Sequence, residues 1–304
     1  MLRSPETSDI LLPVTYKVSP EGHLVVGGCD VVELGRKYGT PLYIMDITTI
    51  KNQCRSYVRS FSFPDLKAEI IFASKAFISI AMCQLVKSEG LSIDVSTGGE
   101  LYIALKSGFP PERIFFHGNN KSKEEIRFGL ENKVGFFIVD NFHELEALET
   151  LCREYGVRQK IMLRITPGIE ASTHKYIQTG KIESKFGFDL HHGFAFEAVK
   201  RVIKSESLVL SGLHAHIGSQ IFNLSCYEKL ISKMVGFIRD IGDKLGIHVG
   251  CINIGGGLGI KYVPEDTPPT VEYFSQVIFR AIKDSEKRYG VKLEKLCLEP
   301  GRSI

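Results

Sequence analysis

The sequence predicts an α/β fold: a (β/α)8 TIM-like barrel with part of a β domain at its N-terminus. Short apolar runs alternate with longer amphipathic stretches along most of the 304 residues, which is typical of parallel strands connected by helices. Eight apolar runs follow one another from residue 69 onward, the number of parallel strands that closes such a barrel. The first ~40 residues differ, with short strands around a turn. An open doubly wound sheet is the alternative that the same alternation allows.

The N-terminal segment predicts two short strands, Val14–Val18 and His23–Val26, joined by a turn at Pro20–Gly22, and a further strand at Leu42–Met45. We expect residues 1–46 to form a β element, part of a second β domain whose C-terminal part is absent, and residues 47–304 to form the barrel. Strands without partners leave an uncovered sheet edge. The sequence is therefore expected to be the front portion of a longer protein.

The barrel region predicts strands and helices in strict alternation. The strands are expected at Glu69–Ala73, Leu91–Val95, Arg113–Phe116, Gly135–Val139, Lys160–Ile165, Leu208–Ala215, His248–Ile254 and Lys295–Leu298. Helices are expected at Ile78–Ser88, Lys123–Glu131, Phe142–Tyr155 and Tyr227–Leu245. One connection, Pro167–Leu190, is unusually long, and long ordered loops in such folds are usually functional.

Composition narrows the class of protein. The chain is 43% hydrophobic and 24% charged, with a formal net charge of +3, as in ordinary globular proteins. No apolar run reaches the ~18 residues of a membrane helix, and Met1–Leu12 lacks the apolar core of a signal peptide, so we expect a cytoplasmic protein without a membrane partner. Basic and acidic residues are interleaved, which argues against a nucleic-acid partner. The cysteines form no Cys-x-x-Cys pair and predict reduced thiols at positions 29, 54, 83, 152, 226, 251 and 297.

Polar or glycine residues follow nearly every predicted barrel strand. In a barrel of this type, the carboxyl ends of the strands form one rim, where ligands bind. The residues that follow the strands are Lys75, Asp94, His117, Asp140, Arg164, His216, Gly255-Gly256-Gly257 and Glu299. This pattern predicts a binding site at the rim.

Each of these groups has a structural explanation as well as a chemical one. A lysine after a buried strand is usually solvated, but its amine can form an imine. Three glycines after a strand can be a flexible loop, or can let backbone N–H groups approach an anion. The run Gly255–Gly257 fits neither the Walker motif nor the dinucleotide fingerprint.

Two further groups are ambiguous when taken singly. His214 and His216 alternate on one strand and could bind a metal, but no third ligand is evident; the simpler explanation is one core and one exposed histidine. Glu299 and Arg302 could form a surface ion pair, or could bind a ring nitrogen and a phosphate or carboxylate. Together, an amine, a phosphate cradle, a histidine that stacks on a ring and a carboxylate predict a pyridoxal phosphate site.

The chain resembles the diaminopimelate decarboxylase family, in the alanine-racemase-like, fold-type III group of pyridoxal phosphate enzymes. The resemblance extends from about Pro41 to the last residue. The segments that carry it are Phe72–Ala76, Asp94–Leu101, Phe116–Ser122, His174–Gly180, Glu183–Gly187, His214–Gln220, Gly255–Gly257 and Glu299–Arg302. The lysine segment and the last two are shared with ornithine and arginine decarboxylases, whereas Phe116–Ser122 and the segment from Thr179 to Gly187 favour the diaminopimelate enzymes.

The resemblance implies pyridoxal 5′-phosphate as cofactor and three catalytic residues. Lys75 is expected to hold the cofactor as an imine, His216 to stack on the pyridine ring, and Glu299 to pair with the ring nitrogen. Ser219, Gly256 and Gly257 are expected to line the phosphate, and Arg302 to contact phosphate and substrate. The resemblance adds four cofactor-site residues: Asp94, Arg164, Gly255 and Gly301. No metal is expected.

The activity implied by the resemblance is decarboxylation of meso-2,6-diaminopimelate to L-lysine and CO2, the last step of lysine biosynthesis, in a homodimer with shared active sites. In this family a C-terminal β domain supplies a cysteine in a Cys-Glu-Ser-type motif and further acidic and tyrosine contacts; this sequence ends before them. Three alternatives stay open: an ornithine- or arginine-type decarboxylase, a cofactor-binding chain without activity, and a barrel that binds another phosphorylated ligand.

Overall fold

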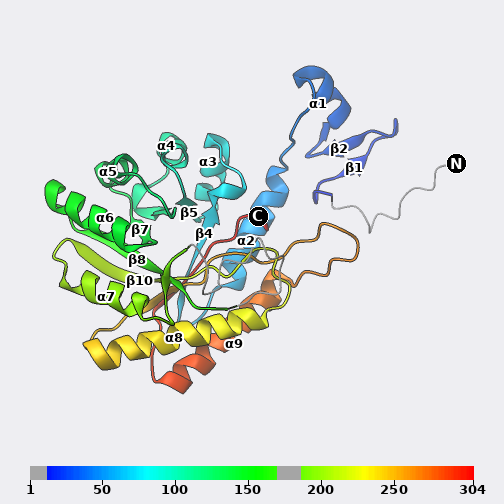
Figure 1. Cartoon of the computed structure of the whole chain (residues 1–304). Coiled ribbons are helices and arrows are strands. Elements are labelled where there is room, and N and C mark those ends of the chain that lie inside the picture. The colour runs from blue at the N-terminus through cyan, green and yellow to red at the C-terminus, as the bar shows by residue number, and fades with distance from the viewer. Residues whose placement is uncertain (1–11, 170–185) are drawn as a thin grey trace.

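The computed structural model describes residues 12–169 and 186–304. Its centre is a parallel β-barrel surrounded by helices, with a small antiparallel sheet to one side (Figure 1). The predicted motif residues 174–180 and 183–185 lie outside the described residues. Within the described ranges, no helix combines the length and apolar character that crossing a bilayer requires.

Eight strands close the barrel, because β10 pairs with both β8 and β11. A further short strand, β9, extends the sheet beside the end of β8. The strands of this sheet are β4 (Lys67–Ala73), β5 (Ser92–Val95), β6 (Ile114–Phe116), β7 (Phe136–Val139), β8 (Gln159–Thr166), β9 (Phe188–Asp189), β10 (Leu208–His214), β11 (Cys251–Asn253) and β12 (Lys295–Leu298). All their pairings are parallel, so the predicted barrel is confirmed and the open sheet is excluded.

Helices follow the strands in sequence and cover the outside of the barrel (Figure 1). They are α2 (Ile47–Ser60), α3 (Ile80–Ser88), α4 (Gly98–Lys106), α5 (Lys123–Glu131), α6 (Phe142–Tyr155), α7 (Phe194–Lys204), α8 (Ser225–Leu245) and α9 (Val271–Tyr289), with short 3-10 turns η1 (Ser74–Ala76) and η2 (Pro111–Arg113). Side-chain caps explain several starts: Thr97, Asn141 and Thr270 each accept a backbone N–H from the first turn of α4, α6 and α9.

Alternation along the strands divides the core into two layers. In β4, Ile71 belongs to a cluster inside the barrel, whereas Ile70 and Phe72 belong to the cluster between strands and helices. The same division separates Ile138 from Phe137 in β7. Successive strand residues point to opposite faces, so buried strands that are covered on both sides read as continuous apolar runs.

The N-terminal region differs from the prediction in two ways. It contains three short antiparallel strands, β1 (Lys17–Val18), β2 (Leu24–Val26) and β3 (Cys29–Asp30), followed by a helix, α1 (Val31–Tyr38). The strand predicted at Leu42–Met45 was wrong: the segment is extended but pairs with no strand in the described chain, and its side chains are exposed except at its boundary with α2. Apolar character without a neighbouring strand does not make a sheet.

Two boundaries in the barrel also differ. The strand predicted at His248–Ile254 is limited to Cys251–Asn253, because backbone pairing to β10 and β12 covers only those residues. The long connection predicted at Pro167–Leu190 contains β9, whose Phe188 pairs with Ile165 of β8. The division of the chain into residues 1–46 and 47–304 stays a prediction.

Candidate active site

The carboxyl ends of the barrel strands surround a cavity of about 260 Å³. Its walls come from the segments after β4, β10, β11 and β12, which are far apart in sequence. Most of the predicted site residues line it: Lys75, His216, Ser219, Gly256, Gly257, Glu299, Gly301 and Arg302. The structure therefore brings together the amine, the histidine, the glycine loop and the carboxylate that the sequence singled out.

Lys75 lies in η1, directly after β4. The carboxylate of Asp94, at the end of the neighbouring strand β5, accepts a hydrogen bond from the backbone N–H of Ser74 at 3.3 Å and so holds the turn that carries the lysine. Burial and the nearby negative charge of Glu299 raise the pKa of Asp94 well above its usual range, although the charge of Lys75 opposes this. Asp94 does not line the cavity itself; it lies behind Lys75.

The glycine loop after β11 packs against neighbouring backbone without space for side chains. A Cβ atom on Gly256 would lie 2.0 Å from the carbonyl oxygen of Glu299, and one on Gly257 would lie 2.1 Å from that of Gly218. The Gly257 carbonyl accepts from the backbone N–H of Ile221 at 2.8 Å. The Gly256 carbonyl accepts from the hydroxyl of Tyr227 at 2.9 Å.

The N–H groups of Gly256 and Gly257, unlike their carbonyls, make no hydrogen bond within the described ranges, although both residues line the cavity, close to Ser219. Gly255 does not line it: its N–H donates to Oδ1 of Asn253 at 2.9 Å, which fixes the start of the loop. Free backbone N–H groups beside a serine hydroxyl are suited to an anion such as phosphate.

His216 lies against the same loop. A Cβ on Gly255 would approach its Nδ1 to 2.8 Å, so only glycine allows the ring to take this position. Burial, with the positive charges of Lys75 and Arg164, lowers the pKa of His216 well below its usual range. The ring is therefore neutral, as a ring that stacks on a pyridine beside a cationic lysine should be.

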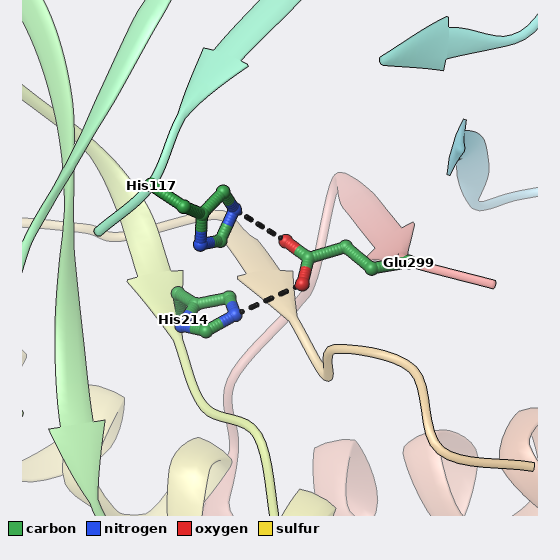
Figure 2. Close-up of side chains that lie close together, drawn as sticks. All are labelled: His117, His214 and Glu299. Atoms are coloured by element: carbon green, nitrogen blue, oxygen red, sulfur yellow. Dashed lines mark hydrogen bonds and ion pairs between the residues drawn. The ribbon is translucent and has the colours of Figure 1, made fainter. Parts of the chain in front are cut away.

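Glu299 is held by side chains that the sequence analysis did not connect with it. Nε2 of His117 lies 2.9 Å from Oε1, and Nε2 of His214 lies 3.2 Å from Oε2 (Figure 2). Nδ2 of Asn253 donates to Oε1 at 2.7 Å. His214 is buried and His216 is partly buried, so the alternative of one core and one exposed histidine does not describe this pair.

His117, His214 and Glu299 are residue types that bind metal ions, and the sequence analysis did not predict that they lie together. Ligand atoms of His117, His214 and Glu299 all lie within 4.8 Å of one another; His216 is not a member of the group. The prediction of no metal stays untested. His117 was recognised only as a residue that follows a strand, and Asn253 was missed because an amide in a buried strand carries no distinctive spacing.

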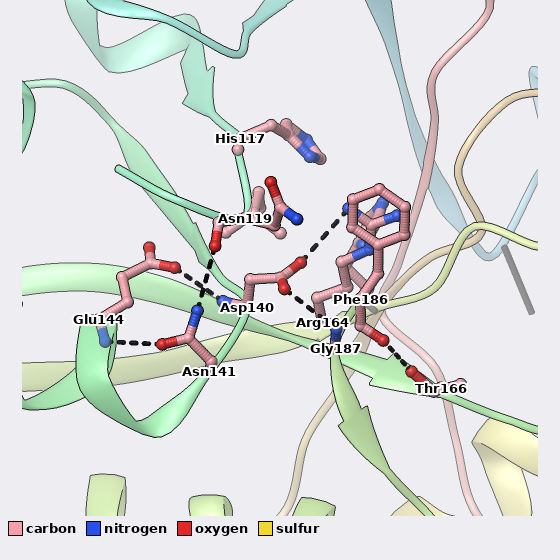
Figure 3. Close-up of polar contacts among 12 residues, drawn as sticks. His117, Asn119, Asp140, Asn141, Glu144, Arg164, Thr166, Phe186 and Gly187 are labelled. Atoms are coloured by element: carbon pink, nitrogen blue, oxygen red, sulfur yellow. Dashed lines mark hydrogen bonds and ion pairs between the residues drawn. The ribbon is translucent and has the colours of Figure 1, made fainter. Parts of the chain in front are cut away.

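Arg164, predicted to be near the cofactor, belongs to a polar network formed with residues that follow β6 and β7 and precede β9 (Figure 3). Its Nη1 lies 3.4 Å from Oδ1 of Asp140, and its guanidinium lies 4.3 Å from the ring centroid of Phe186. Oδ2 of Asp140 accepts from the N–H of Gly187 at 3.1 Å. Arg164 and Asp140 therefore position the segment that leads into β9, and Arg164 does not line the cavity.

Behind this network lies a buried ion pair between Lys121 and Glu144. Nζ of Lys121 lies 2.6 Å from Oε1 of Glu144 and also donates to the carbonyls of Gly118 and Ile138, at 2.7 and 2.9 Å. Oε2 of Glu144 accepts from the N–H of Asp140 at 2.9 Å. Lys121, part of the family segment Phe116–Ser122, thus anchors the loop that carries His117.

Arg302 differs from the other predicted residues because it is exposed. It lines the mouth of the cavity, and its guanidinium lies 5.6 Å from the ring centroid of Tyr262. The next residue, Ser303, bonds to the hydroxyl of the buried Tyr57 at 2.7 Å, which ties this turn to α2. An exposed guanidinium at the mouth is suited to an incoming carboxylate.

The described residues fit pyridoxal phosphate chemically. An amine, anion-binding backbone N–H groups, a neutral imidazole and a buried carboxylate line one cavity. These are the groups needed for the aldehyde, the phosphate, the face of the ring and the protonated ring nitrogen.

Comparison with known proteins agrees with this set. Residues 47–304 match the family model described as "Pyridoxal-dependent decarboxylase, pyridoxal binding domain". Diaminopimelate decarboxylase of Bacillus subtilis is 46% identical over 290 residues, covering 95% of this chain and 66% of that protein. The enzyme of Staphylococcus aureus is 40% identical, covering 96% and 68%.

Solved structures show the same relationship. Diaminopimelate decarboxylase of M. jannaschii in complex with L-lysine superimposes with a TM-score of 0.87 at 34% identity, covering 95% of this chain and 67% of that one. The Helicobacter pylori enzyme, also with L-lysine, gives 0.80 at 33% identity, covering 90% and 66%. The chain spans about two thirds of the length of the curated relatives that it matches. By its cavity and by these similarities, the chain belongs to the family of pyridoxal-dependent decarboxylases and contains their pyridoxal-binding domain.

Proposed function

We propose that this chain is the cofactor-binding part of a decarboxylase that converts meso-2,6-diaminopimelate to L-lysine and CO2, the last step of lysine biosynthesis. The observation that carries the proposal is the single cavity lined by Lys75, His216 and Glu299. Relatives with 40% to 46% identity bear the name of the diaminopimelate enzyme, which favours this substrate over ornithine or arginine.

Each residue of the cavity would have a separate role in the reaction. Bound pyridoxal phosphate supplies an electron sink for the pair left behind when a carboxylate leaves as CO2. Nζ of Lys75 would hold the cofactor covalently and, once displaced by the substrate amine, is placed to return a proton to carbon. Glu299 would keep a proton on the ring nitrogen. His216 would cover one face of the ring and exclude water from it.

Other residues would bind and orient. The N–H groups of Gly256 and Gly257, with the hydroxyl of Ser219, would hold the phosphate. Arg302, at the mouth, would contact phosphate and substrate carboxylate. Asp94 would fix the turn that carries Lys75.

The cofactor assignment can be tested by reductive trapping. We would mix the purified chain with pyridoxal phosphate, reduce it with borohydride, digest it and map the label by mass. We expect the label on Lys75, its loss in Lys75→Ala, and its retention in Lys106→Ala, since Lys106 is an exposed lysine on α4. Absence of label from Lys75 in a chain that circular dichroism shows to be folded would favour a barrel for another phosphorylated ligand.

The substrate requires a second experiment. CO2 release from diaminopimelate, ornithine and arginine would be measured for this chain and for the Bacillus subtilis relative. The family resemblance places further substrate contacts in a C-terminal domain, so we expect this chain to bind cofactor but to release CO2 far more slowly than the relative. Any release should come from diaminopimelate; preferential release from ornithine or arginine would favour the alternative decarboxylases.

We also propose that the complete enzyme is a cytoplasmic homodimer whose subunits share active sites. The support is the family resemblance, in which substrate contacts cross the dimer interface. Light scattering coupled to size exclusion, with and without cofactor, should give twice the protomer mass; a monomer with full activity would contradict the proposal.

A further inference from the structure

Three side chains from the carboxyl ends of three barrel strands surround the carboxylate of Glu299. His117 follows β6, His214 ends β10 and Asn253 ends β11, while Glu299 follows β12 (Figure 2). The side chains of His117, His214 and Glu299 are 9%, 1% and 5% exposed. A carboxylate at this depth is stable as an anion only if its oxygens receive hydrogen bonds.

The histidines are neutral at physiological pH. Burial lowers the pKa of His214 to about 4 and also lowers that of His117, although the charge of Glu299 opposes both shifts. Burial raises the pKa of Glu299, but the electrostatic interaction with His117 and His214, together with hydrogen bonding, outweighs burial and holds this pKa well below its usual range. The cluster therefore holds one anion between two uncharged rings.

Neutrality fixes which nitrogen of each ring carries the proton. A neutral imidazole has one N–H, and an ionised carboxylate only accepts. Because Nε2 of each ring faces Glu299, the proton must be on Nε2. Nδ1 of His214 agrees with this assignment, since it is buried and has no hydrogen-bond partner in the described ranges, so that a hydrogen placed there would be left without an acceptor.

The arrangement leaves one acceptor position on the carboxylate. An ionised carboxylate offers about four such positions. Oε1 accepts from Asn253 and lies 2.9 Å from Nε2 of His117, which is within ion-pair distance but does not have hydrogen-bond geometry, whereas Oε2 hydrogen-bonds to His214 alone. Glu299 also lines the cavity beside Lys75 and His216. The remaining position on Oε2 is therefore available to one N–H donor of a ligand.

We propose that His117 and His214 are positioning residues of the cofactor site, which keep Glu299 ionised and oriented so that Oε2 accepts the N–H of the protonated ring nitrogen. The inference rests on the proposed function, because it needs a pyridine ring in the cavity. In this inference, the rings of His117 and His214 contact the carboxylate of Glu299 and do not contact the cofactor. His216 differs from them because its ring would lie against the cofactor itself.

A divalent cation is the competing occupant of this cluster. Three ligand atoms are close enough to hold one. However, Lys75 and Arg164 already place positive charge nearby, as their effect on the pKa of His117 shows, after the larger effect of burial. A further dication there is disfavoured by repulsion.

The test compares donor-retaining and donor-free variants in the chain loaded with pyridoxal phosphate labelled with ¹⁵N in the ring. The variants are His214→Gln, His214→Leu and His117→Leu; the amide of Gln can replace the Nε2–H donor. His248→Gln is the matched control, because His248 is exposed and precedes β11, whose opposite end carries Asn253. The readouts are the ¹⁵N shift of the ring nitrogen against pH and the dissociation constant of the cofactor.

We expect a protonated ring nitrogen in the wild-type chain, in His214→Gln and in the control. In each leucine variant the nitrogen should lose its proton at a lower pH, and cofactor affinity should fall about tenfold, the effect of one charge-assisted hydrogen bond. His117→Leu, at a slightly less buried position than His214, provides a second test if His214→Leu does not fold.

Two results would overturn the inference. One is an unchanged ¹⁵N titration in folded leucine variants that still carry the cofactor on Lys75. The other is stoichiometric zinc binding that persists in the cofactor-loaded chain and disappears in His117→Leu, since that would assign the cluster to a metal. If the wild-type chain takes no label on Lys75, the proposed function fails instead, and the two failures are thereby distinguished.

Discussion

Lys121 shows how a single buried side chain supports a site that it does not touch. Its ammonium group donates hydrogen bonds to one carboxylate and two backbone carbonyls, so all three of its N–H donors have partners. Burial raises the pKa of Glu144, and the pair with Lys121 opposes this. The pair connects the His117 loop to α6, so its loss should affect both stability and the position of His117.

We expect Lys121→Met to lower the free energy of unfolding by about 3–5 kcal/mol, because it leaves Glu144 buried without its counter-charge. Urea denaturation monitored by circular dichroism would measure the loss. Arg153→Ala is the control: it removes an exposed ion pair with Glu149 on α6 and should leave stability nearly unchanged. Equal, small losses in both variants would show that the Lys121 pair contributes nothing.

At the scale of elements, the connections after the strands do most to shape the site. The loop after β11 has Gly257 with φ of +111°, packed against the backbone of Gly218 and the side chain of Ile221. Helix α5, after β6, begins with a capping box in which Ser122 and Glu125 exchange hydrogen bonds with each other's backbone N–H. Glu125 also accepts from the N–H of Gly98 at 2.7 Å, so it joins the starts of two neighbouring helices.

Gly257→Ala should weaken both folding and cofactor binding, because the new Cβ would displace the loop from Gly218. Gly246→Ala provides the matched control: it has φ of +68° but no atom within 4 Å of the added Cβ. We expect the control variant to be destabilised only by the strain of a left-handed conformation, about 1 kcal/mol, and to bind the cofactor with unchanged affinity. Fluorescence titration with pyridoxal phosphate should give a dissociation constant for Gly257→Ala that is at least about tenfold higher than for Gly246→Ala. Equal dissociation constants would contradict the close approach of Gly257 to Gly218.

Removing the capping carboxylate should destabilise α5 and its junction with α4. Glu125→Ala is expected to cost about 1–2 kcal/mol, from the lost cap and the unpaired Gly98 N–H. Glu124→Ala, one residue earlier in the same turn, should cost much less because its side chain makes neither contact. Thermal unfolding of the two variants would measure the difference, and an equal shift in both would exclude the capping role.

At the scale of the whole molecule, the barrel concentrates buried histidines at one rim. Burial lowers the pKa of His117, His214 and His216. In the unfolded chain these rings return to a pKa of about 6.5. The unfolded state therefore binds more protons than the folded state below this pH, and acid favours unfolding.

We predict that the contribution of these histidines to the free energy of unfolding is retained above about pH 6.5 and is lost as the pH decreases toward 4. The pKa of about 4 for His214 corresponds to a loss on the order of 3 kcal/mol over this window. The raised pKa values of Asp94 and Glu144 act in the opposite direction, so the histidine contribution is read from the difference between variants. Urea denaturation of the chain without added cofactor, at several pH values, should show a smaller loss on acidification in His214→Gln than in the exposed-site variant His248→Gln; equal pH dependence in the two variants would refute the assignment.

The periodicity of apolar residues and the residues that end each run were sufficient to predict the eight barrel strands, the rim to which they deliver polar residues, and several of the residues that line the cavity, among them Lys75, His216 and Glu299. These features are local: a buried strand must be apolar, and the residue after it must lie at the rim. The same local rule failed at Leu42–Met45, where an apolar run has no neighbouring strand to pair with.

Only the tertiary structure decided how the rim residues meet. Closure through β8 and β10 places His117 and His214 on the two oxygens of Glu299, and Asn253 beside them. It also places Arg164 in the network of Asp140, where its side chain does not line the cavity. Such contacts depend on which strand ends lie near one another and on the direction of each side chain. A pairing such as that of His214 with Glu299, which are 85 residues apart, leaves no periodic trace in the sequence.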